Sequence, residues 1–195
     1  MPSPAGPAEL LADLSRALRT LGVRWYVFGA QAVLIWGRPR MTADVDVTVR
    51  LESDDTTSFA AALQERGFRL RVSGTPEFVR QTRVLPLVHT ASDMALDIVL
   101  AGPGLEELFL SRAVEFEIGG APVPLISAED LVVTKILAGR PKDIEDIRGV
   151  LRARGDTLDI DAARTTLRLL EEALGQGDLI PLFEAEVVRW RQGTR

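Results

Sequence analysis

Two aspartates, Asp44 and Asp46, stand one residue apart in the stretch DVDVTV. The alternation of acidic and β-branched residues predicts a strand, and alternate residues of a strand project from the same face. Two neighbouring carboxylates repel each other and are costly to bury without compensation. Such a pair can also cap a turn or meet solvent, but a divalent cation is the simplest partner that would stabilise it.

A third acid, Asp97, lies inside the apolar stretch LDIVL. Its neighbours Leu96 and Ile98 are predicted on the opposite face of a second strand, so Asp97 faces either a site or a strong partner. Three carboxylates from two strands would bind hard cations through oxygen, and oxygen ligands favour Mg²⁺ or Mn²⁺. Two such cations position a triphosphate and activate an attacking hydroxyl.

A phosphate-sized turn is predicted upstream of these acids. The apolar run VRWYVF stops at Gly29, and QAVLIWG follows as a short helix. A helix that starts directly after a strand exposes backbone N–H groups, which suit a phosphate. Arg38 and Arg40 precede the acids. We expect Arg40 to neutralise the acids or to hold phosphate oxygens, whereas Arg38 is equally well explained as an exposed loop residue.

Composition limits the class of protein. The chain has 195 residues, of which 46% are hydrophobic and 26% charged, enough for one globular domain with a small helical appendage. It has no cysteine and a single histidine, His89, which excludes thiol catalysis and His-rich metal sites. The net charge of −5 argues against a broad basic face for nucleic acid. A local acceptor-binding cluster remains open, with the candidates Arg69, Arg71, Arg80 and Arg83.

Neither a membrane span nor a secretion signal is predicted. No apolar run approaches the roughly 20 residues that a membrane helix needs. The N-terminal stretch MPSPAGPAELL lacks a basic start and an apolar core. We therefore expect a cytoplasmic protein with no membrane partner.

The pattern of elements predicts a sheet-rich first half and a helical tail. Leucines at helical spacing predict a helix over 10–21, and strands are expected at 23–28, 44–50 and 94–101, with a helix at 55–66. Residues 68–90 read as strand-like, with breaks at Gly74 and Pro76, and residues 114–126 as a hairpin. Helices are expected after a Ser127 cap, from Pro141, and at 160–174 and 178–191. This order indicates an α/β or α+β fold with a helical C-terminal extension.

Two stretches of the sequence resemble a known family. The run YVFGAQAVLIWGRPRMTADVDVTV is similar to the signature of the nucleotidyltransferase superfamily, which has the DNA polymerase β-like fold. The pattern Arg-x-Thr-x-Asp-x-Asp and the later KILAGRPKDIEDI resemble the AbiEii-type group, which includes toxins of type IV toxin–antitoxin systems. The resemblance covers about residues 20–150. It implies a mixed sheet flanked by helices, with a catalytic core over 1–125 and a helical region over 126–195 packed on that core.

The resemblance also implies roles for individual residues. Asp44, Asp46 and Asp97 would ligate the metal, and Asp97 would also help to deprotonate the acceptor hydroxyl. Asp143 and Asp146 would support the site from one face of a helix, although a solvated helix N-terminus explains them, and Lys142, equally well. The family turn commonly reads Gly-Gly or Gly-Ser, where this chain has Gly29-Ala30, so Gln31 is the substitute donor. The nucleotide- and phosphate-binding residues implied are Gly29, Ala30, Gln31, Arg40, Thr42, Lys135 and Lys142.

The expected activity is transfer of a nucleoside monophosphate from a nucleoside triphosphate to an acceptor hydroxyl, with Mg²⁺ or Mn²⁺. The acceptor is an RNA 3′ end such as that of tRNA, a protein side chain or a small molecule such as an antibiotic. A toxin role would add a cognate antitoxin protein as partner. The alternative is a degenerate, catalytically weak nucleotide-binding or protein-interaction module, which Ala30 favours and the three retained acids oppose. Stabilisation by metal and triphosphate distinguishes the two.

Overall fold

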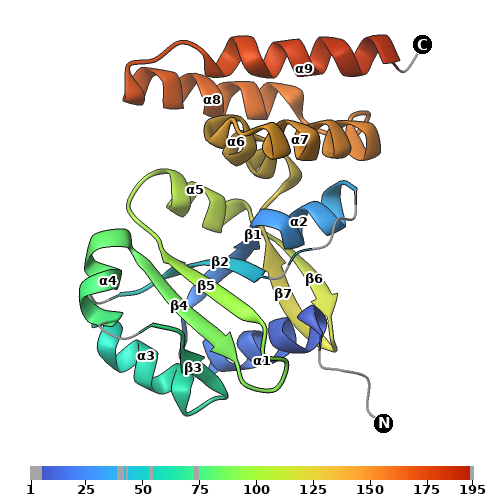
Figure 1. Ribbon diagram of the computed structural model, residues 1–195. Coiled ribbons are helices and arrows are strands. Elements are labelled where there is room, and N and C mark those ends of the chain that lie inside the picture. Colours follow the sequence, from blue (N-terminus) through green and yellow to red (C-terminus); the bar gives the residue numbers. More distant parts are fainter. Residues whose placement is uncertain (1–5, 39–41, 43, 53–54, 73–74, 194–195) are drawn as a thin grey trace. The chain divides into compact units, whose positions relative to one another are not determined.

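The computed structural model describes residues 6–38, 42, 44–52, 55–72 and 75–193 (Figure 1). The chain forms two compact units: unit 1 comprises residues 1–31 and 41–126, and unit 2 comprises residues 32–40 and 127–195. The boundary lies inside helix α2 (Gly29–Trp36), whose first turn belongs to unit 1. Unit 2 thus takes in the predicted helical region together with the second part of α2. The packing of that region on the core stays a prediction.

Unit 1 is built on a mixed sheet, which confirms the predicted fold class. Among the described residues the sheet has seven strands in the order β3-β4-β5-β2-β1-β7-β6. β2 pairs in parallel with β5, and β1 in parallel with β7; the other neighbours are antiparallel. The strands are β1 (Arg24–Phe28), β2 (Asp44–Arg50), β3 (Phe68–Leu70), β4 (Val84–His89), β5 (Ala95–Leu100), β6 (Val114–Ile118) and β7 (Ala121–Leu125).

One face of this sheet is covered by helix α1 (Pro7–Thr20), which packs against β1, β6 and β7. On the same face as the fully buried Val45 and Leu96 lies His89, whose Nε2 is 3.0 Å from Asp13 Oδ2 of α1. His89 is therefore a buried link between α1 and the sheet. Because strand residues alternate, the acids of β2 and β5 lie on the opposite face.

Three further helices complete unit 1: α3 (Thr56–Gln64), α4 (Thr75–Thr82) and α5 (Leu105–Arg112). α3 packs against β3, α4 against β4, and α5 against β1. The prediction of a strand-like segment over 68–90 is wrong for α4, where Pro76 occupies the first turn of a helix. Proline suits that position because its missing N–H is not needed there. The sequence pattern does not predict α5, since only Phe109 of its residues is buried and its apolar pattern is short.

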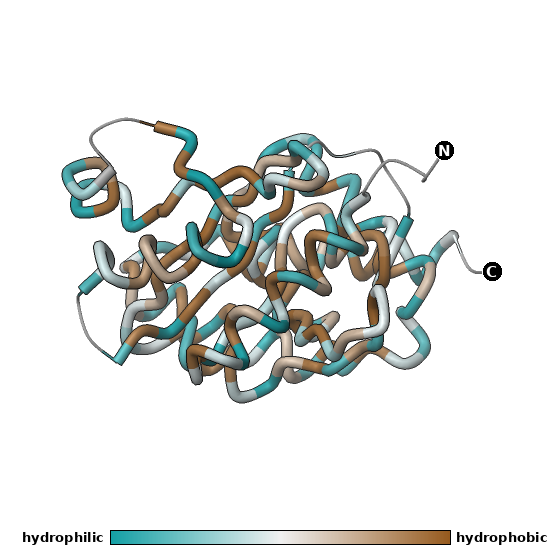
Figure 2. The backbone as a smooth tube through the Cα atoms, turned by 90° about the horizontal axis from the view of Figure 1, so that it is seen from below, coloured by the Kyte–Doolittle hydropathy of each residue, from teal (hydrophilic) through white to brown (hydrophobic). Residues whose placement is uncertain are grey.

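Unit 2 contains α6 (Ala128–Ala138), α7 (Pro141–Arg154), α8 (Ile160–Leu174) and α9 (Leu179–Gly193), in agreement with the four helices predicted there. α6 packs against the other three, and α9 against α7 and α8. The predicted Ser127 cap is confirmed, because its hydroxyl accepts a 3.1 Å hydrogen bond from the Asp130 backbone N–H. Apolar and polar stretches alternate along the described part of the backbone (Figure 2). Within the described ranges, no helix has both the length and the hydropathy needed to cross a membrane.

Candidate active site

The three predicted acids converge on one face of the unit 1 sheet. Asp46 pairs in register with Asp97 across the parallel β2–β5 ladder, and Asp44 lies two residues before Asp46. One carboxylate oxygen from each acid lies within 4.8 Å of the other two, and all three residues are partly exposed. The ladder therefore brings together residues that are far apart in sequence. An all-oxygen donor set of this spacing, open to solvent, fits Mg²⁺ or Mn²⁺.

Gly29 adjoins this site directly. Its φ is +64°, a left-handed conformation that glycine adopts without strain. A Cβ built on Gly29 would lie 2.2 Å from Asp46 Oδ2, so no other residue leaves room for that carboxylate. Phe28, the residue before it, pairs with Asp46 in the β1–β2 register. The turn into α2 and the carboxylate site are thus one continuous structure.

Two more predicted residues lie in unit 1 beside the turn and the acids. The Thr42 hydroxyl donates a 2.6 Å hydrogen bond to Asp44 Oδ1, which orients that carboxylate. Gln31, in the first turn of α2, is 6% exposed, and its Nε2 has no hydrogen-bond partner within the described part of the chain. Leaving a buried donor unsatisfied costs about 1–3 kcal/mol. Ala30, next to it, is buried and offers no side-chain donor.

Arg71, one of the candidates for an acceptor-binding cluster, lies at this site, and its contact with a carboxylate was not predicted from the sequence. Its Nη2 donates a 2.6 Å hydrogen bond to Asp97 Oδ1, in an ion pair whose side chains are 38% and 26% exposed. Partial burial raises the pKa of Asp97 above its ordinary value, and the Asp44 charge adds to this, while Arg71 acts in the opposite direction. The guanidinium is therefore the counterion of the third carboxylate.

The remaining members of the predicted arginine cluster have partners of their own. Arg69 pairs with Asp93 at 2.6 Å, and Arg80 pairs with Glu77 one helical turn away. Arg83 donates to the carbonyl oxygen of Leu100. Arg40 lies outside the described residues.

Lys135 and the two supporting acids form a buried cluster within unit 2. Lys135 Nζ donates to Asp143 Oδ1 at 3.0 Å and to Asp146 Oδ2 at 2.7 Å, and Arg140 Nε donates to Asp143 Oδ2 at 2.5 Å. Burial of Asp143 favours its neutral form, but the hydrogen bonds from Arg140 and Lys135 outweigh it and lower its pKa. This network links α6 to α7 and so stabilises the packing of the two helices. A phosphate contact of Lys135 stays a prediction, as does one of the exposed Lys142.

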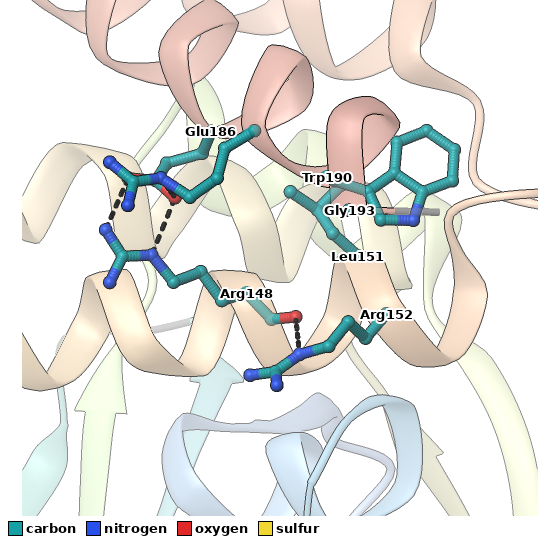
Figure 3. Close-up of a pocket in the computed structure, with 7 residues that line it drawn as sticks. Arg148, Leu151, Arg152, Glu186, Trp190 and Gly193 are labelled. Carbon is teal, nitrogen blue, oxygen red and sulfur yellow. Dashed lines mark hydrogen bonds and ion pairs between the residues drawn. The ribbon is translucent and has the colours of Figure 1, made fainter. Parts of the chain in front are cut away.

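A hollow lies between α7 and α9 of unit 2 and has a volume of about 300 Å³ (Figure 3). Arg148 forms two hydrogen bonds with the buried Glu186, at 2.7 and 2.8 Å, and Arg189 approaches the same carboxylate at 3.5 Å. Arg152 donates to the backbone oxygen of Arg148. We therefore interpret this hollow as the rim of an ion-paired helix interface.

Two solved structures are similar to the chain in fold. The antibiotic-resistance factor ANT(2″)-Ia, solved in solution, gives a TM-score of 0.58 at 16% identity and covers 89% of this chain and 97% of its own. The lincosamide antibiotic adenylyltransferase LnuA, solved with lincomycin bound, gives a TM-score of 0.52 at 17% identity, covering 76% of this chain and 98% of its own. At these identities the likeness concerns the fold.

Comparison with protein families gives the assignment. No curated protein matches the chain in sequence. The family model described as "Nucleotidyltransferase of unknown function (DUF6036)" matches residues 9–162, a span that holds the carboxylates, the Gly29 turn and the first two helices of unit 2. The chain belongs to this nucleotidyltransferase family.

Proposed function

We propose that the chain is a metal-dependent nucleotidyltransferase that moves a nucleoside monophosphate from a nucleoside triphosphate to an acceptor hydroxyl. One observation carries the proposal: three carboxylates from two strands gather beside a glycine turn where a Cβ would collide with one of them. Family membership and fold support a transferase of this class, and the specific reaction is what we propose.

Asp44, Asp46 and Asp97 would hold the cations. When bound, divalent cations neutralise the triphosphate charge and make a coordinated hydroxyl more acidic. Thr42 keeps Asp44 oriented through its 2.6 Å hydrogen bond. Because the strands fix the spacing of the acids, the chain supplies mainly position and electrostatic stabilisation.

In the proposed reaction the acceptor oxygen attacks the α-phosphorus and forms a new P–O bond. The bond from that phosphorus to the bridging oxygen breaks, and pyrophosphate leaves with the electron pair. The proton of the acceptor hydroxyl passes to a carboxylate oxygen of Asp97. No oxidant or further reactant is needed for this exchange.

The triphosphate is assigned to the Gly29 side of the carboxylates. The first turn of α2 offers backbone N–H groups there, and Gly29 lets the chain pass close to Asp46. The unpartnered Gln31 Nε2 would donate to a phosphate oxygen and thereby satisfy a buried donor. This compensates for Ala30, which cannot supply the hydroxyl of a Gly-Ser turn.

Two acceptor classes follow from different observations. The AbiEii-like residues favour an RNA 3′ end such as that of tRNA, within a cytoplasmic toxin–antitoxin system with a cognate antitoxin. Similarity to ANT(2″)-Ia and LnuA favours a small-molecule antibiotic. A catalytically weak nucleotide-binding module of the same fold is the non-enzymatic alternative.

The test measures melting temperature with each nucleoside triphosphate, with and without Mg²⁺. A ligand at 100 times its Kd stabilises by about 2.7 kcal/mol, which is a shift of several degrees. Asp44→Asn should abolish the shift, while Asp156→Asn, a change at an exposed acid outside the site, should keep it. The active enzyme should then transfer α-phosphate label to total RNA or to lincomycin. If wild-type protein shows no shift with any triphosphate and no transfer, the proposal is wrong.

A further inference from the structure

A row of residues crosses the sheet at the carboxylate site and extends beyond it. Asp97 pairs with Asp46 on one side and with Pro86 on the other, and Asp46 pairs with Phe28. The Arg71 backbone N–H donates to the Pro86 oxygen at 3.1 Å, which continues the row onto the end of β3. We call Arg71, Pro86, Asp97, Asp46 and Phe28 the central row.

Arg71 shares a face with the acids, since neighbours in a sheet row project to the same side. Pro86 separates it from Asp97 and carries no charge, so the arginine side chain reaches over the proline. The outcome is the 2.6 Å contact between Arg71 Nη2 and Asp97 Oδ1. The strand register therefore places the two side chains within contact distance of each other.

The two ends of the central row differ in chemistry. Phe28 and the Gly29 turn lie at the β1 end, where the proposed function assigns the triphosphate. The strand order places β3, with Arg71, on the other side of the carboxylates. A hydroxyl that attacks the α-phosphorus with Asp97 as its base would then approach from the β3 side.

We propose that Arg71 is a positioning residue on the acceptor side: it holds Asp97 in the cation-free protein and, once cations occupy the carboxylates, binds an anionic group of the acceptor. This inference rests on the proposed function and adds the acceptor's chemistry. The acceptor carries a phosphate or carboxylate within a guanidinium's reach of its reacting hydroxyl, as the terminal nucleotide of an RNA does.

Charge favours this assignment. Three carboxylates and two divalent cations sum to one positive charge, while the bound triphosphate brings negative charge on the Gly29 side. At the β3 end lies the guanidinium that leaves Asp97, and Arg69, two residues earlier and on the same face, adds a second cation that Asp93 partly offsets at 2.6 Å. An anionic group of the acceptor would therefore find its counterion at this end of the central row. Arginine binds phosphate and carboxylate through two parallel N–H donors, which also fixes orientation.

The first experiment tests the contact between Arg71 and Asp97. It measures Mn²⁺ binding by electron paramagnetic resonance in the absence of nucleotide. Arg71→Gln should bind Mn²⁺ about tenfold more tightly than wild type, because a competing positive charge is removed. Arg71→Lys should remain close to wild type, and Arg16→Gln, which alters an exposed, ion-paired arginine of α1, serves as the matched control. Equal Mn²⁺ affinity for wild type and Arg71→Gln would overturn the inference, since a guanidinium that leaves Asp97 when cations bind must compete with them.

The second experiment tests the acceptor with Mn²⁺ and the α,β-methylene analogue of whichever triphosphate gives the largest thermal shift. The probe is a short 5′-labelled oligoadenylate with a free 3′ hydroxyl, compared by fluorescence anisotropy with the same oligomer carrying a neutral methylphosphonate as its last linkage. Wild type should prefer the charged oligomer by about tenfold, and Arg71→Gln should lose that preference. Arg16→Gln should keep it, and Arg71→Lys should restore part of it.

Each outcome separates this inference from the function on which it rests. Equal binding of both oligomers by wild type, or tighter binding of lincomycin than of either oligomer, would overturn the anionic acceptor and leave the transferase intact. Wild-type protein that binds neither Mn²⁺ nor the triphosphate analogue would overturn both.

Discussion

Replacing Gly29 by alanine tests the link between the turn and the carboxylates. Two costs are expected. An L-residue at φ +64° pays about 1–2 kcal/mol for the left-handed conformation. The new methyl, 2.2 Å from Asp46 Oδ2, must also displace that carboxylate, and moving a side chain away from its preferred rotamer costs about 1 kcal/mol more.

The matched control is Gly22, which has a similar φ of +67° and no atom within 4 Å of the place where an alanine methyl would lie. Gly22→Ala should therefore lower the free energy of unfolding by about 1–2 kcal/mol, and Gly29→Ala by about 2–3 kcal/mol. Both variants gain equally from a less flexible unfolded chain, so this effect cancels in the comparison. Urea denaturation followed by circular dichroism measures the difference.

Function should respond far more than stability. Gly29→Ala displaces a predicted metal ligand, and losses of this kind weaken metal affinity by about tenfold to hundredfold, whereas Gly22→Ala should leave Mn²⁺ binding unchanged. In an Asp46→Ala background the extra cost of Gly29→Ala should shrink toward that of Gly22→Ala. If Gly29→Ala binds Mn²⁺ as well as wild type does, the close approach of turn and carboxylate has no part in the site.

Two further predictions concern unit 2. Lys135→Met leaves the buried Asp143 and Asp146 without their ammonium partner and should cost about 3–5 kcal/mol of unfolding free energy in the absence of any nucleotide; unchanged stability with weakened nucleotide binding would instead favour the phosphate role. The Arg148 hydrogen bonds hold the pKa of Glu186 below its ordinary value of 4.5, so this pair stabilises the fold fully above that pH and less as pH falls below it. Glu186→Gln should accordingly lower the melting temperature at pH 7 and differ less from wild type in acid, and a gap that stays constant down to about pH 3 would contradict this.

The strands that carry the acids can be predicted because their pattern is local. In β2 polar and apolar residues alternate, which places Asp44 and Asp46 on one face, and in β5 Asp97 is a lone acid within an apolar run, which points to a site. The helix α4 escapes prediction for the opposite reason. Among residues 76–82 of this helix only Val79 is buried, and a segment that short cannot be told from a strand by periodicity.

Residues whose role depends on pairing between elements are harder to predict. Arg71 reaches Asp97 only because three strands align in a particular register, and register is not visible in one sequence. Lys135 meets Asp143 and Asp146 only after α6 and α7 pack together. A lysine on an amphipathic helix gives no sign of such partners, so its sequence-based role rests on resemblance alone.

The parallel pairing of β2 with β5 has a consequence for engineering. Hydrogen bonds of the backbone ladder, and not the cation, set the spacing of the acids. The folded chain must hold like charges together before any ligand arrives, which lowers its resistance to heat. A library screened for thermal robustness alone would thus be enriched in amides at Asp44 or Asp46, and under the proposed function those survivors would be inert. On that proposal, thermal stability and catalysis are opposed at a few atoms of one sheet.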